Sequence, residues 1–546
     1  MRLLRSPGHR ALILTLILWL YLATTLPTFD FDESLYRRVT ESMRQSGNPW
    51  LLTCDGRELF HKPPVFYWLI WCASSLVDAG KTTVSAMAAR IPSLLSSLGI
   101  LFSLHAGMKY LFPDQKDRKP LLSPVFAFLS SAFAVLTGTA VILDPLQTLA
   151  LMPALIIPAR MFIREEPPAR SHWLLTGASL ALAACIKGLN GLVIPSFAIG
   201  IHLLLQLRSW GAKRVFKTAL AFGLFAFIPA VLAASAFFLL LHQKIGPAFT
   251  REFFLVQHLG RGANPMEAHG GGILYHPLMV LAGGGFLTPL LIHLIHDRRP
   301  QFSRYGFPLT FALSFVLAFG FSATKLPHYT WPVWPALALF AGILETLPSL
   351  DRPLPRRAGF LAILPVLFTG SALLLLAIAP GILFEALAKD PVSTALIRHL
   401  TPFTFWQKSC FLAGSAACWI FQVRRSQIAR STAMTAMFSS IAVTGLAFGL
   451  APGAKELLVQ PFYGIAMSLK ARHPPASSCI RYAGPYSATL SLALGPELSQ
   501  GSCEPEKTQF LIVPEWKEQD CAPARFGMIA RSSWLILCEA LPVQHP

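Results

Sequence analysis

Long apolar runs separated by short basic turns are the main pattern along this chain. A hydrocarbon core about 30 Å thick takes roughly 20 apolar helical residues to cross, and about thirteen runs reach that length. These runs begin near Ala11, Ile91, Leu121, Ala140, Trp173, Leu189, Val215, Gly272, Tyr305, Trp331, Gly359, Phe405 and Thr432. The pattern predicts a polytopic α-helical membrane protein.

The basic turns indicate how the chain is oriented, because short cytoplasmic loops are enriched in Lys and Arg. If the N-terminus is cytoplasmic, every expected cytoplasmic turn is basic, and the tail from about Ala451 lies outside. The basic residues of these turns are Lys116, Arg118, Lys119, Arg160, Arg164, Arg170, Arg208, Lys213, Arg214, Lys217, Arg298, Arg299, Arg304, Arg352, Arg356, Arg357, Arg424 and Arg425.

Composition changes this picture little. Of the 546 residues, 53% are hydrophobic and 13% are charged, which is typical of a membrane protein. The net charge of +19 is spread over the turns and forms no continuous face, so we expect no nucleic-acid partner. The first run follows Arg2, Arg5 and Arg10, but no small-residue cleavage site precedes Asp30 and Asp32, so we interpret it as a retained span.

The external loop at residues 28–89 opens with an amphipathic stretch. Leu35, Val39 and Met43 recur every four residues, which predicts a helix lying in the membrane interface. A second apolar piece, from Val65 to Leu76, is too short to span and is expected to be interfacial or re-entrant. The basic side chains of the first helix are expected to face water or headgroups: Arg37, Arg38 and Arg44.

The tail has a different character from the rest of the chain. A helical stretch from Lys455 to Ala471 precedes short apolar runs at Phe510–Val513 and Trp534–Cys538, which are typical of strands. We expect a transmembrane catalytic domain at residues 1–450 and a small external α/β domain at residues 451–546. The tail also holds four cysteines, which form up to two disulfides in an oxidising compartment or remain free thiols: Cys479, Cys503, Cys521 and Cys538.

Ionisable groups near membrane depth usually serve function. Asp32 and Glu33 follow the first span, where a carboxylate can act as a general base or cap the helix that begins there. Lys62 precedes two prolines that fix an extended backbone, so it either holds a phosphate or extends toward the headgroups.

More cations lie on the expected outer side, where few are predicted. Each alone is explained by a structural role, but together with Lys62 they can converge on one anionic ligand such as a lipid-linked phosphate. Asp144 lies near the outer end of the fourth span and is expected near the same cations. The further groups are Lys187, His258, Arg261, Lys325, His328 and Tyr329.

The order of these motifs resembles that of the aminoarabinose lipid A transferases and their relatives. The chain contains D-E-x-x-Y, K-P-P, AARIPS, LDPL, IKG, QHLGR and KLPHYTWPVWP in the family order. The resemblance covers nearly the whole chain and implies the C-type glycosyltransferase fold shared with protein O-mannosyltransferases. It also implies a bacterial inner-membrane location, with the α/β domain in the periplasm.

Residue roles follow from the same resemblance. The family's essential first-loop aspartate corresponds to Asp32, its neighbour to Glu33, and its fourth-span acid to Asp144. The family's donor-phosphate lysine corresponds to Lys62. Its remaining donor-site residues correspond to Tyr36, His258, Arg261 and Tyr329.

The chain departs from the family pattern at two places. The family usually has Tyr-Phe-Glu before Lys-Pro-Pro, whereas Leu59, Phe60 and His61 stand here. An arginine usually precedes the tyrosine of D-E-x-x-Y, whereas Leu35 stands here. Because a carboxylate is the natural partner of an ammonium group and His61 is not, the class of donor carries over better than its sugar.

The resulting expectation is a glycosyltransferase that moves a sugar from a polyprenyl phosphate donor to a glycolipid or glycoprotein acceptor. Lys62 and Arg261 would stabilise the departing phosphate, and Asp32 would act on the acceptor. No Gly-rich nucleotide loop is present in the sequence, and we expect no cofactor, with a divalent metal left open. The alternatives are a flippase or transporter of lipid-linked sugars, or a non-catalytic assembly factor.

Overall fold

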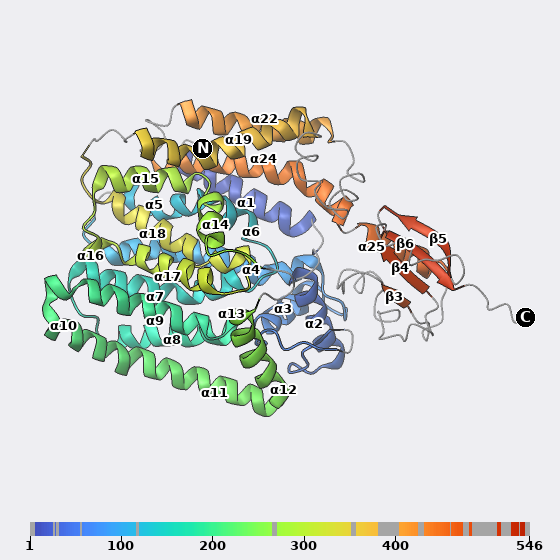
Figure 1. Cartoon of the computed structure of the whole chain (residues 1–546), viewed down its shortest axis with the longest axis horizontal. Coiled ribbons are helices and arrows are strands. Elements are labelled where there is room, and N and C mark those ends of the chain that lie inside the picture. Colours follow the sequence, from blue (N-terminus) through green and yellow to red (C-terminus); the bar gives the residue numbers. More distant parts are fainter. Residues whose placement is uncertain are drawn as a thin grey trace, which may run out of the picture.

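The structure is a computed structural model of the chain. It describes residues 6–25, 28, 32–54, 57–115, 119–264, 270–350, 356–380, 403–423, 431–458, 460–472, 480–482, 510–514, 526–533 and 535–540. Long helices run side by side through most of the molecule, and a small sheet lies beyond one end of them (Figure 1). The mostly helical fold class is therefore as the apolar runs predict.

The helices follow one another with short connections. The first half contains α1 (Pro7–Thr25), α2 (Asp32–Ser46), α3 (Val65–Val77), α4 (Ala86–Leu111), α5 (Lys119–Leu129), α6 (Ala132–Thr137), α7 (Asp144–Arg164), α8 (Arg170–Lys187), α9 (Asn190–Leu205), α10 (Leu207–Phe222), the π-helix η2 (Gly223–Phe227), α11 (Ile228–Ile245), α12 (Pro247–Thr250), the π-helix η3 (Arg251–Gly260) and α13 (Arg261–Ala263). The second half contains α14 (Tyr275–Gly283), α15 (Leu287–Arg298), α16 (Phe302–Tyr305), α17 (Phe307–Phe321), the 3₁₀ helix η4 (Pro327–Thr330), α18 (Val333–Glu345), α19 (Arg356–Ile378), α22 (Phe405–Val423), α24 (Thr432–Leu458) and α25 (Gln460–Lys470).

Fewer helices meet the length of a membrane span than the sequence predicts. Within the described residues, five helices are long and apolar enough, or six if α14 and α15, which are bent by 92° to each other, form one span. The expected count of about thirteen spans is therefore not confirmed. Several apolar helices are shorter than a span, among them α3, α9 and α17.

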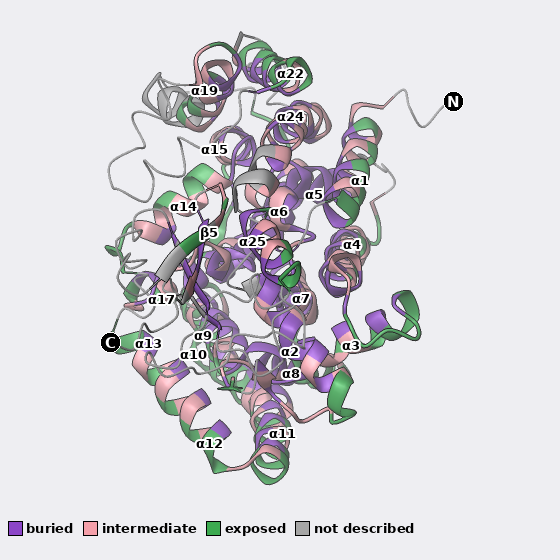
Figure 2. Cartoon of the chain, turned by 90° about the vertical axis from the view of Figure 1, so that its right-hand side faces the viewer, coloured by how far each residue is buried: buried purple, intermediate pink, exposed green. Residues whose placement is uncertain are grey.

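The interior of the helix bundle is closely packed with aromatic and aliphatic side chains. Trp19, Trp173, Trp331 and Trp334 are fully buried, and Trp19 donates a hydrogen bond to the carbonyl of Val135 at 2.7 Å. Large apolar side chains also cover the outside of the bundle, for example along α11, where Figure 2 shows many exposed residues. An apolar exterior around an apolar interior is the arrangement that a hydrocarbon environment favours.

Helix α2 packs its predicted apolar stripe against the protein. Val39 and Met43 are fully buried, and Leu35 is partly buried against the same cluster. The stripe is therefore confirmed as the buried face of α2, because the spacing of four residues places these side chains on one side of a helix.

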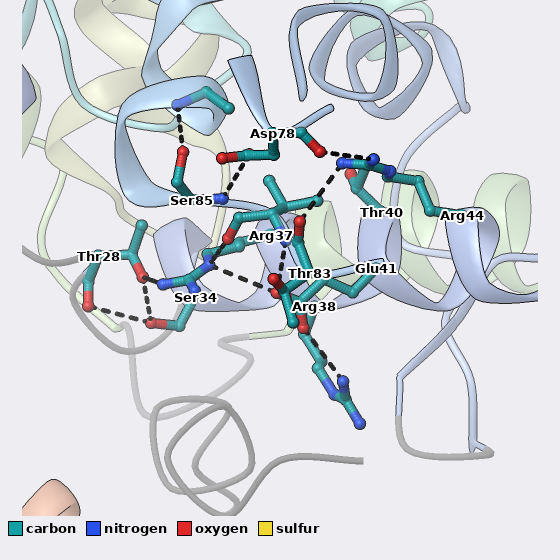
Figure 3. Close-up of polar contacts among 12 residues, drawn as sticks. Thr28, Ser34, Arg37, Arg38, Thr40, Glu41, Arg44, Asp78, Thr83 and Ser85 are labelled. Atoms are coloured by element: carbon teal, nitrogen blue, oxygen red, sulfur yellow. Dashed lines mark hydrogen bonds and ion pairs between the residues drawn. The ribbon is translucent and has the colours of Figure 1, made fainter. Parts of the chain in front are cut away.

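The arginines of α2 do not behave as expected. Arg44 donates hydrogen bonds to the carbonyls of Asp78, Lys81 and Thr83, and Figure 3 shows the contacts with Asp78 and Thr83. Arg37 contacts Glu41 and the carbonyl of Val84 in the same way. The expectation that these arginines face water or headgroups was wrong for Arg37, because the segment that leads into α4 supplies a carbonyl acceptor for it. Arg44 also bonds to that segment but stays partly exposed.

Glu41 completes this network. Its carboxylate is almost fully buried, accepts a hydrogen bond from the amide of Val84 at 2.9 Å and pairs with Arg38 at 3.1 Å. Asp78 accepts a hydrogen bond from the amide of Ser85 at 2.8 Å, and Ser85 in turn caps the start of α4. Buried charges that are paired and hydrogen-bonded hold two elements in a defined geometry. The network therefore fixes α2 against the start of α4.

The tail forms a small α/β unit. Strands β3 (Ile480–Tyr482), β4 (Phe510–Pro514), β5 (Phe526–Ser532) and β6 (Leu535–Ala540) form a sheet in the order β3-β4-β6-β5, and only β3 and β4 are parallel. Helix α25 packs Phe462, Ile465 and Leu469 against its apolar face. The expected strands at both apolar runs are confirmed, whereas α24 continues to Leu458 and so crosses the expected boundary at residue 451. A two-stranded ribbon, β1 (Thr53–Cys54) and β2 (Arg57–Glu58), lies between α2 and α3.

The tail sheet also contains a disulfide. Cys538, in the middle of β6, is disulfide-bonded, whereas Cys54, Cys72, Cys185, Cys410 and Cys418 form no disulfide. The three other tail cysteines lie outside the described residues: Cys479, Cys503 and Cys521.

We expect mass mapping without reduction to find Cys538 linked to one of those cysteines. Cross-links of this kind stabilise small domains by about 2 to 4 kcal/mol, so Cys538→Ser should lower the unfolding temperature of the tail. The exposed thiol of Cys72 is the internal control, since it should be alkylated without reduction. Alkylation of all four tail cysteines under the same conditions would contradict the disulfide.

Candidate functional site

A cavity of about 390 Å³ lies where the ends of several helices meet. The end of α8, the start of α9, the end of α17 and the short helices η3, α13 and η4 surround it, and the segment before α3 closes one side. These elements lie at the end of the bundle that also carries α2 and α3 (Figure 1). The lining comprises His61, Lys62, Lys187, Asn190, Ile194, Gln257, His258, Arg261, Gly262, Ala318, Phe319, Phe321, Ser322 and Tyr329.

Three cations from distant parts of the sequence line this one cavity. Lys62 lies before α3, Lys187 is the last residue of α8, and Arg261 begins α13. Their convergence is as the sequence predicts. A cavity lined by several cations in surroundings of low polarity is suited to bind a phosphate.

Lys325 does not join the cations that line the cavity. Its ammonium group donates hydrogen bonds to the carbonyls of Phe319 and Gly320, the former at 3.0 Å. These carbonyls lie in the last turn of α17, where they have no partner in the helix itself. Lys325 therefore caps α17, and its expected contribution to the anion site was wrong.

Arg261 is held in place by two polar neighbours. Its Nε donates to Oε1 of Gln257 at 2.7 Å, and Gln257 donates its amide to Glu252 at 3.0 Å. The Nη1 atom of Arg261 lies 3.5 Å from the hydroxyl of Tyr329. Gln257 and Arg261 are four residues apart, so they lie on one face of η3 and α13. That spacing is the signal by which the role of Gln257, which the sequence analysis did not assign, could have been found.

His258 is fixed as a neutral imidazole by two backbone groups. Its Nδ1 lies 2.8 Å from the carbonyl of Phe253, and its Nε2 accepts a hydrogen bond from the amide of Leu189 at 3.2 Å. Burial lowers the pKa of His258 below its usual value; the Phe253 carbonyl opposes this shift, and the Lys62 ammonium adds to it. The ring is thus an uncharged bridge between η3 and the start of α9.

Gly188 makes the approach of His258 possible. It has a φ of +108°, and a Cβ atom there would lie 2.3 Å from Nε2 of His258. Gly188 separates Lys187, which ends α8, from the start of α9 at Asn190. Only glycine combines this backbone conformation with the close contact of the ring.

We expect Gly188→Ala to destabilise the protein. With φ +108° and ψ −165°, Gly188 lies in a region that is essentially open to glycine alone. A residue with a Cβ atom is destabilised by about 1 to 3 kcal/mol there, and the contact with His258 adds to that cost. The matched control is Gly200→Ala in the interior of α9, where a Cβ atom meets nothing within 4 Å. Unfolding temperatures in detergent that are equal for the two variants would show that His258 does not depend on Gly188.

Asp144 and Lys187 form a buried ion pair beside the cavity. Asp144 is the first residue of α7, and its carboxylate binds the ammonium of Lys187 at the end of α8. The same ammonium lies 5.0 Å from the centre of the Tyr329 ring. An acid at a helix N-terminus and a lysine at a C-terminus are both in their favoured positions. Asp144 was expected to lie near the cations of the candidate site, and it contacts one of them, Lys187.

Glu33 is engaged in a buried network. Its carboxylate pairs with Arg90 at 3.1 Å and accepts a hydrogen bond from the amide of Val141 at 2.8 Å. Arg90 also donates to the carbonyl of Leu22 at the end of α1. Glu33 therefore ties the first turn of α2 to α1, α4 and the segment before α7. Asp32 is the first residue of α2, and its side chain lies outside what the structure describes.

Tyr36 lies in aromatic packing and is not among the residues that line the cavity. Its ring packs edge-on against Phe66, with centroids 5.2 Å apart, and against Tyr67 at 5.5 Å. Tyr36 is almost fully buried between α2 and α3. Among the described residues, no group of three or more His, Cys, Asp or Glu side chains is placed to hold a metal ion.

One wall of the cavity is apolar, which the sequence analysis did not anticipate. Ile194 comes from α9, and Ala318, Phe319 and Phe321 come from α17. Phe321 is largely exposed at the outer edge of this wall. The cavity thus places cations and hydrocarbon side by side, an arrangement that suits a ligand with a phosphate and an apolar chain.

Comparison with known proteins gives three kinds of match. The model of the dolichyl-phosphate-mannose-protein mannosyltransferase family matches residues 61–232. The undecaprenyl phosphate-alpha-4-amino-4-deoxy-L-arabinose arabinosyl transferase of Edwardsiella ictaluri is 26% identical over 67% of this chain, and that of Erwinia tasmaniensis is 26% identical over 70%. The matched regions span 65% and 68% of those two proteins.

The fold is that of a solved structure. The crystal structure of ArnT from Cupriavidus metallidurans bound to undecaprenyl phosphate superimposes with a TM-score of 0.74 and 19% sequence identity, over 98% of each chain. The apo form of the same protein gives a TM-score of 0.71.

Proposed function

From the premise that this chain belongs to the C-type glycosyltransferases related to the aminoarabinose transferases, we propose that it uses a polyprenyl phosphate sugar, in bacteria an undecaprenyl phosphate sugar, as donor. The acceptor is a lipid A or lipopolysaccharide-type glycolipid, or another component of the cell envelope. Transfer takes place at the periplasmic face of the inner membrane.

The observation that carries this proposal is the cavity itself. Lys62, Lys187 and Arg261 line the side that would receive the phosphate, and α9 and α17 supply the apolar side that would receive the polyprenyl chain. The relative with the same fold binds undecaprenyl phosphate, according to the description of its structure. A donor with both parts fits a cavity with both surfaces.

The proposed reaction is a direct displacement at the anomeric carbon. An acceptor oxygen forms a bond to that carbon while the bond between the carbon and the phosphate oxygen breaks, and polyprenyl phosphate leaves with the electron pair. Lys62 and Arg261 stabilise the charge that grows on the phosphate, and Tyr329 and Gln257 orient Arg261. His258 closes the site as a neutral group.

We assign the acids different roles. Asp32 orients the acceptor and takes its proton when the acceptor is a hydroxyl, and it only positions the acceptor when that is a phosphate. Glu33 positions Asp32, because its pairs with Arg90 and Val141 fix the first turn of α2. Asp144 holds Lys187 toward the cavity, and Tyr36 supports α2 from the side of Phe66.

The orientation in the membrane is part of the same proposal. Helix α7 runs from Asp144 beside the cavity to Arg160 and Arg164 at the other end of the bundle. Since basic turns stay in the cytoplasm, the cavity end is periplasmic. The α/β domain, which lies beyond the cavity end in Figure 1, is then periplasmic too, as is expected if about thirteen segments cross or enter the membrane.

A fusion of alkaline phosphatase after Arg472, beyond α25, is expected to be active, because this enzyme folds only in the periplasm. The matched fusion after Glu166, in the turn between α7 and α8, should be inactive. Both fusion points lie two residues beyond the end of a helix, α25 at Lys470 and α7 at Arg164. A stable fusion after Arg472 without activity would place the tail in the cytoplasm.

Mass spectrometry of envelope glycolipids tests the function in cells. A deletion strain should lack one sugar on one glycolipid, and the wild-type gene should restore it. The Lys62→Ala variant should not restore it. Glycolipids identical to those of the parent strain, under conditions in which the protein is made, would contradict the proposed function.

A further inference from the structure

A second cavity, of about 160 Å³, lies at the end of the bundle opposite the candidate functional site. The end of α4, the last turns of α7, the start of α8 and the turn between α7 and α8 surround it. Arg160, Arg164 and Glu166 line it, and the rings of Tyr110 and His172 form part of its wall. The reaction proposed above uses none of these side chains, so this cavity is separate from the donor site.

Both arginines are held in place and still have N–H groups for a ligand. The guanidinium of Arg160 lies 4.3 Å from the centre of the Tyr110 ring, and its Nη1 donates to the carbonyl of Tyr110. Arg164 donates from Nε to the carbonyl of Leu111 at 3.3 Å and pairs through Nη2 with Asp114 at 3.1 Å. Asp114 is 86% exposed, and a pair that open to water is weak. Because a guanidinium has five N–H donors, these contacts leave several on each arginine.

The turn between α7 and α8 sets the position of Glu166. Glu165 follows the last residue of α7 with a φ of 57°, and its carbonyl accepts a hydrogen bond from Arg214. Pro167 directly follows Glu166 and restricts its backbone to extended conformations. Within the part of the chain that the structure describes, Glu166 is exposed and forms no ion pair with either arginine of the cavity. The cavity therefore presents two positive groups and one negative group that do not neutralise one another.

Apolar surface adjoins these charges. Leu174 and Leu175 follow His172 on α8 and are 50% and 52% exposed. Helices α4 and α7 are both long and apolar enough to span a membrane, and the cavity lies at their ends, which is the depth of the lipid headgroups. Basic pockets between membrane helices at this depth bind the phosphates of lipid headgroups.

We propose that this cavity binds a phospholipid whose headgroup carries a phosphate and a terminal ammonium, as in phosphatidylethanolamine, from the leaflet at that end of the bundle. The phosphate lies against Arg160 and Arg164, and the ammonium pairs with Glu166. The acyl chains lie along Leu174 and Leu175. A headgroup such as phosphatidylglycerol, which has the phosphate but no ammonium, leaves the carboxylate of Glu166 without this pair.

Competition between two lipids tests this inference. The purified full-length protein in detergent would be incubated with equal amounts of phosphatidylethanolamine and phosphatidylglycerol that have the same acyl chains, and bound lipid would be counted by native mass spectrometry. We expect phosphatidylethanolamine to be preferred by about twofold to fivefold, as an exposed ion pair allows. Equal binding, or a preference for phosphatidylglycerol, would overturn the inference. O-phosphoethanolamine, which has no acyl chains, should bind more weakly than the lipid, and binding as tight as that of the lipid would overturn the assignment to a lipid.

Substitutions separate the two halves of the headgroup. Glu166→Gln should make the two lipids bind equally, whereas Arg160→Ala and Arg164→Ala should weaken the binding of both. Lys213→Ala, at an exposed cation of α10 that does not line the cavity, is the control and should change neither. Unfolding temperatures show which variants are folded; if Arg160→Ala is not, Arg164→Ala alone decides the phosphate half. A preference that persists in Glu166→Gln, or lipid binding that a folded Arg164→Ala protein keeps in full, would contradict the proposed site.

Discussion

Lys62→Ala is expected to weaken binding of the polyprenyl phosphate donor and to slow transfer by roughly 100-fold to 1,000-fold, the range found when one hydrogen-bond donor to a developing oxyanion is removed from an enzyme. Lys62 lies on the cavity wall, and the two prolines that directly follow it restrict the backbone. Its charge acts on both the bound donor and the leaving phosphate, so both measured quantities should change.

Lys81→Ala is the matched control for that substitution. Lys81 is exposed, lies between α3 and α4, and contacts the α2 network through its backbone carbonyl and amide. Its loss should leave transfer and donor binding unchanged. Lys62→Arg keeps the charge and should recover part of the activity. A Lys62→Ala protein with wild-type donor affinity would remove Lys62 from the phosphate site.

Asp32→Asn is expected to abolish most transfer while donor binding stays near normal. Asparagine has the size of aspartate and caps a helix about as well, so a residue that only began α2 would tolerate the change. A group that takes a proton from the acceptor would not, and transfer should fall by about 100-fold to 10,000-fold. The two readings of Asp32 therefore predict opposite results for one variant.

The comparison with Asp114→Asn controls for the loss of one negative charge. Asp114 is exposed and pairs with Arg164 at 3.1 Å at the other end of the bundle. Both variants should reach the membrane in equal amounts, measured by immunoblot. Near-normal transfer by a correctly inserted Asp32→Asn protein would leave Asp32 as a helix cap.

Local patterns were predicted well from the sequence. Val39 and Met43 are buried on one face of α2, and the apolar runs near Phe510 and Leu535 form neighbouring strands, because such features depend on residues close together in the chain. The partners of the α2 arginines were not predictable in this way. The carbonyls of Lys81 and Val84 come within reach of these arginines only when the backbone after α3 is folded, and no local sequence pattern indicates that fold.

The site was predicted in part for a similar reason. The order of motifs indicated that Lys62, Arg261 and Tyr329 act together, and the structure places them around one cavity. Whether a given cation faces that cavity depends on the helix ends. Lys187 ends α8 at the cavity, whereas Lys325 turns back onto the carbonyls of α17. The expected span count is not confirmed, because several apolar runs form helices shorter than the usual length of a span.

The most direct test of the central claim is transfer by the purified protein. It would be incubated in nanodiscs with undecaprenyl phosphate carrying a radiolabelled sugar and with glycolipid extracted from a deletion strain. Label should appear on the glycolipid, together with an equal amount of released undecaprenyl phosphate, and Lys62→Ala should show neither. A donor that remains intact with the wild-type protein, or that crosses the bilayer with its sugar still attached, would contradict the account and indicate a transporter.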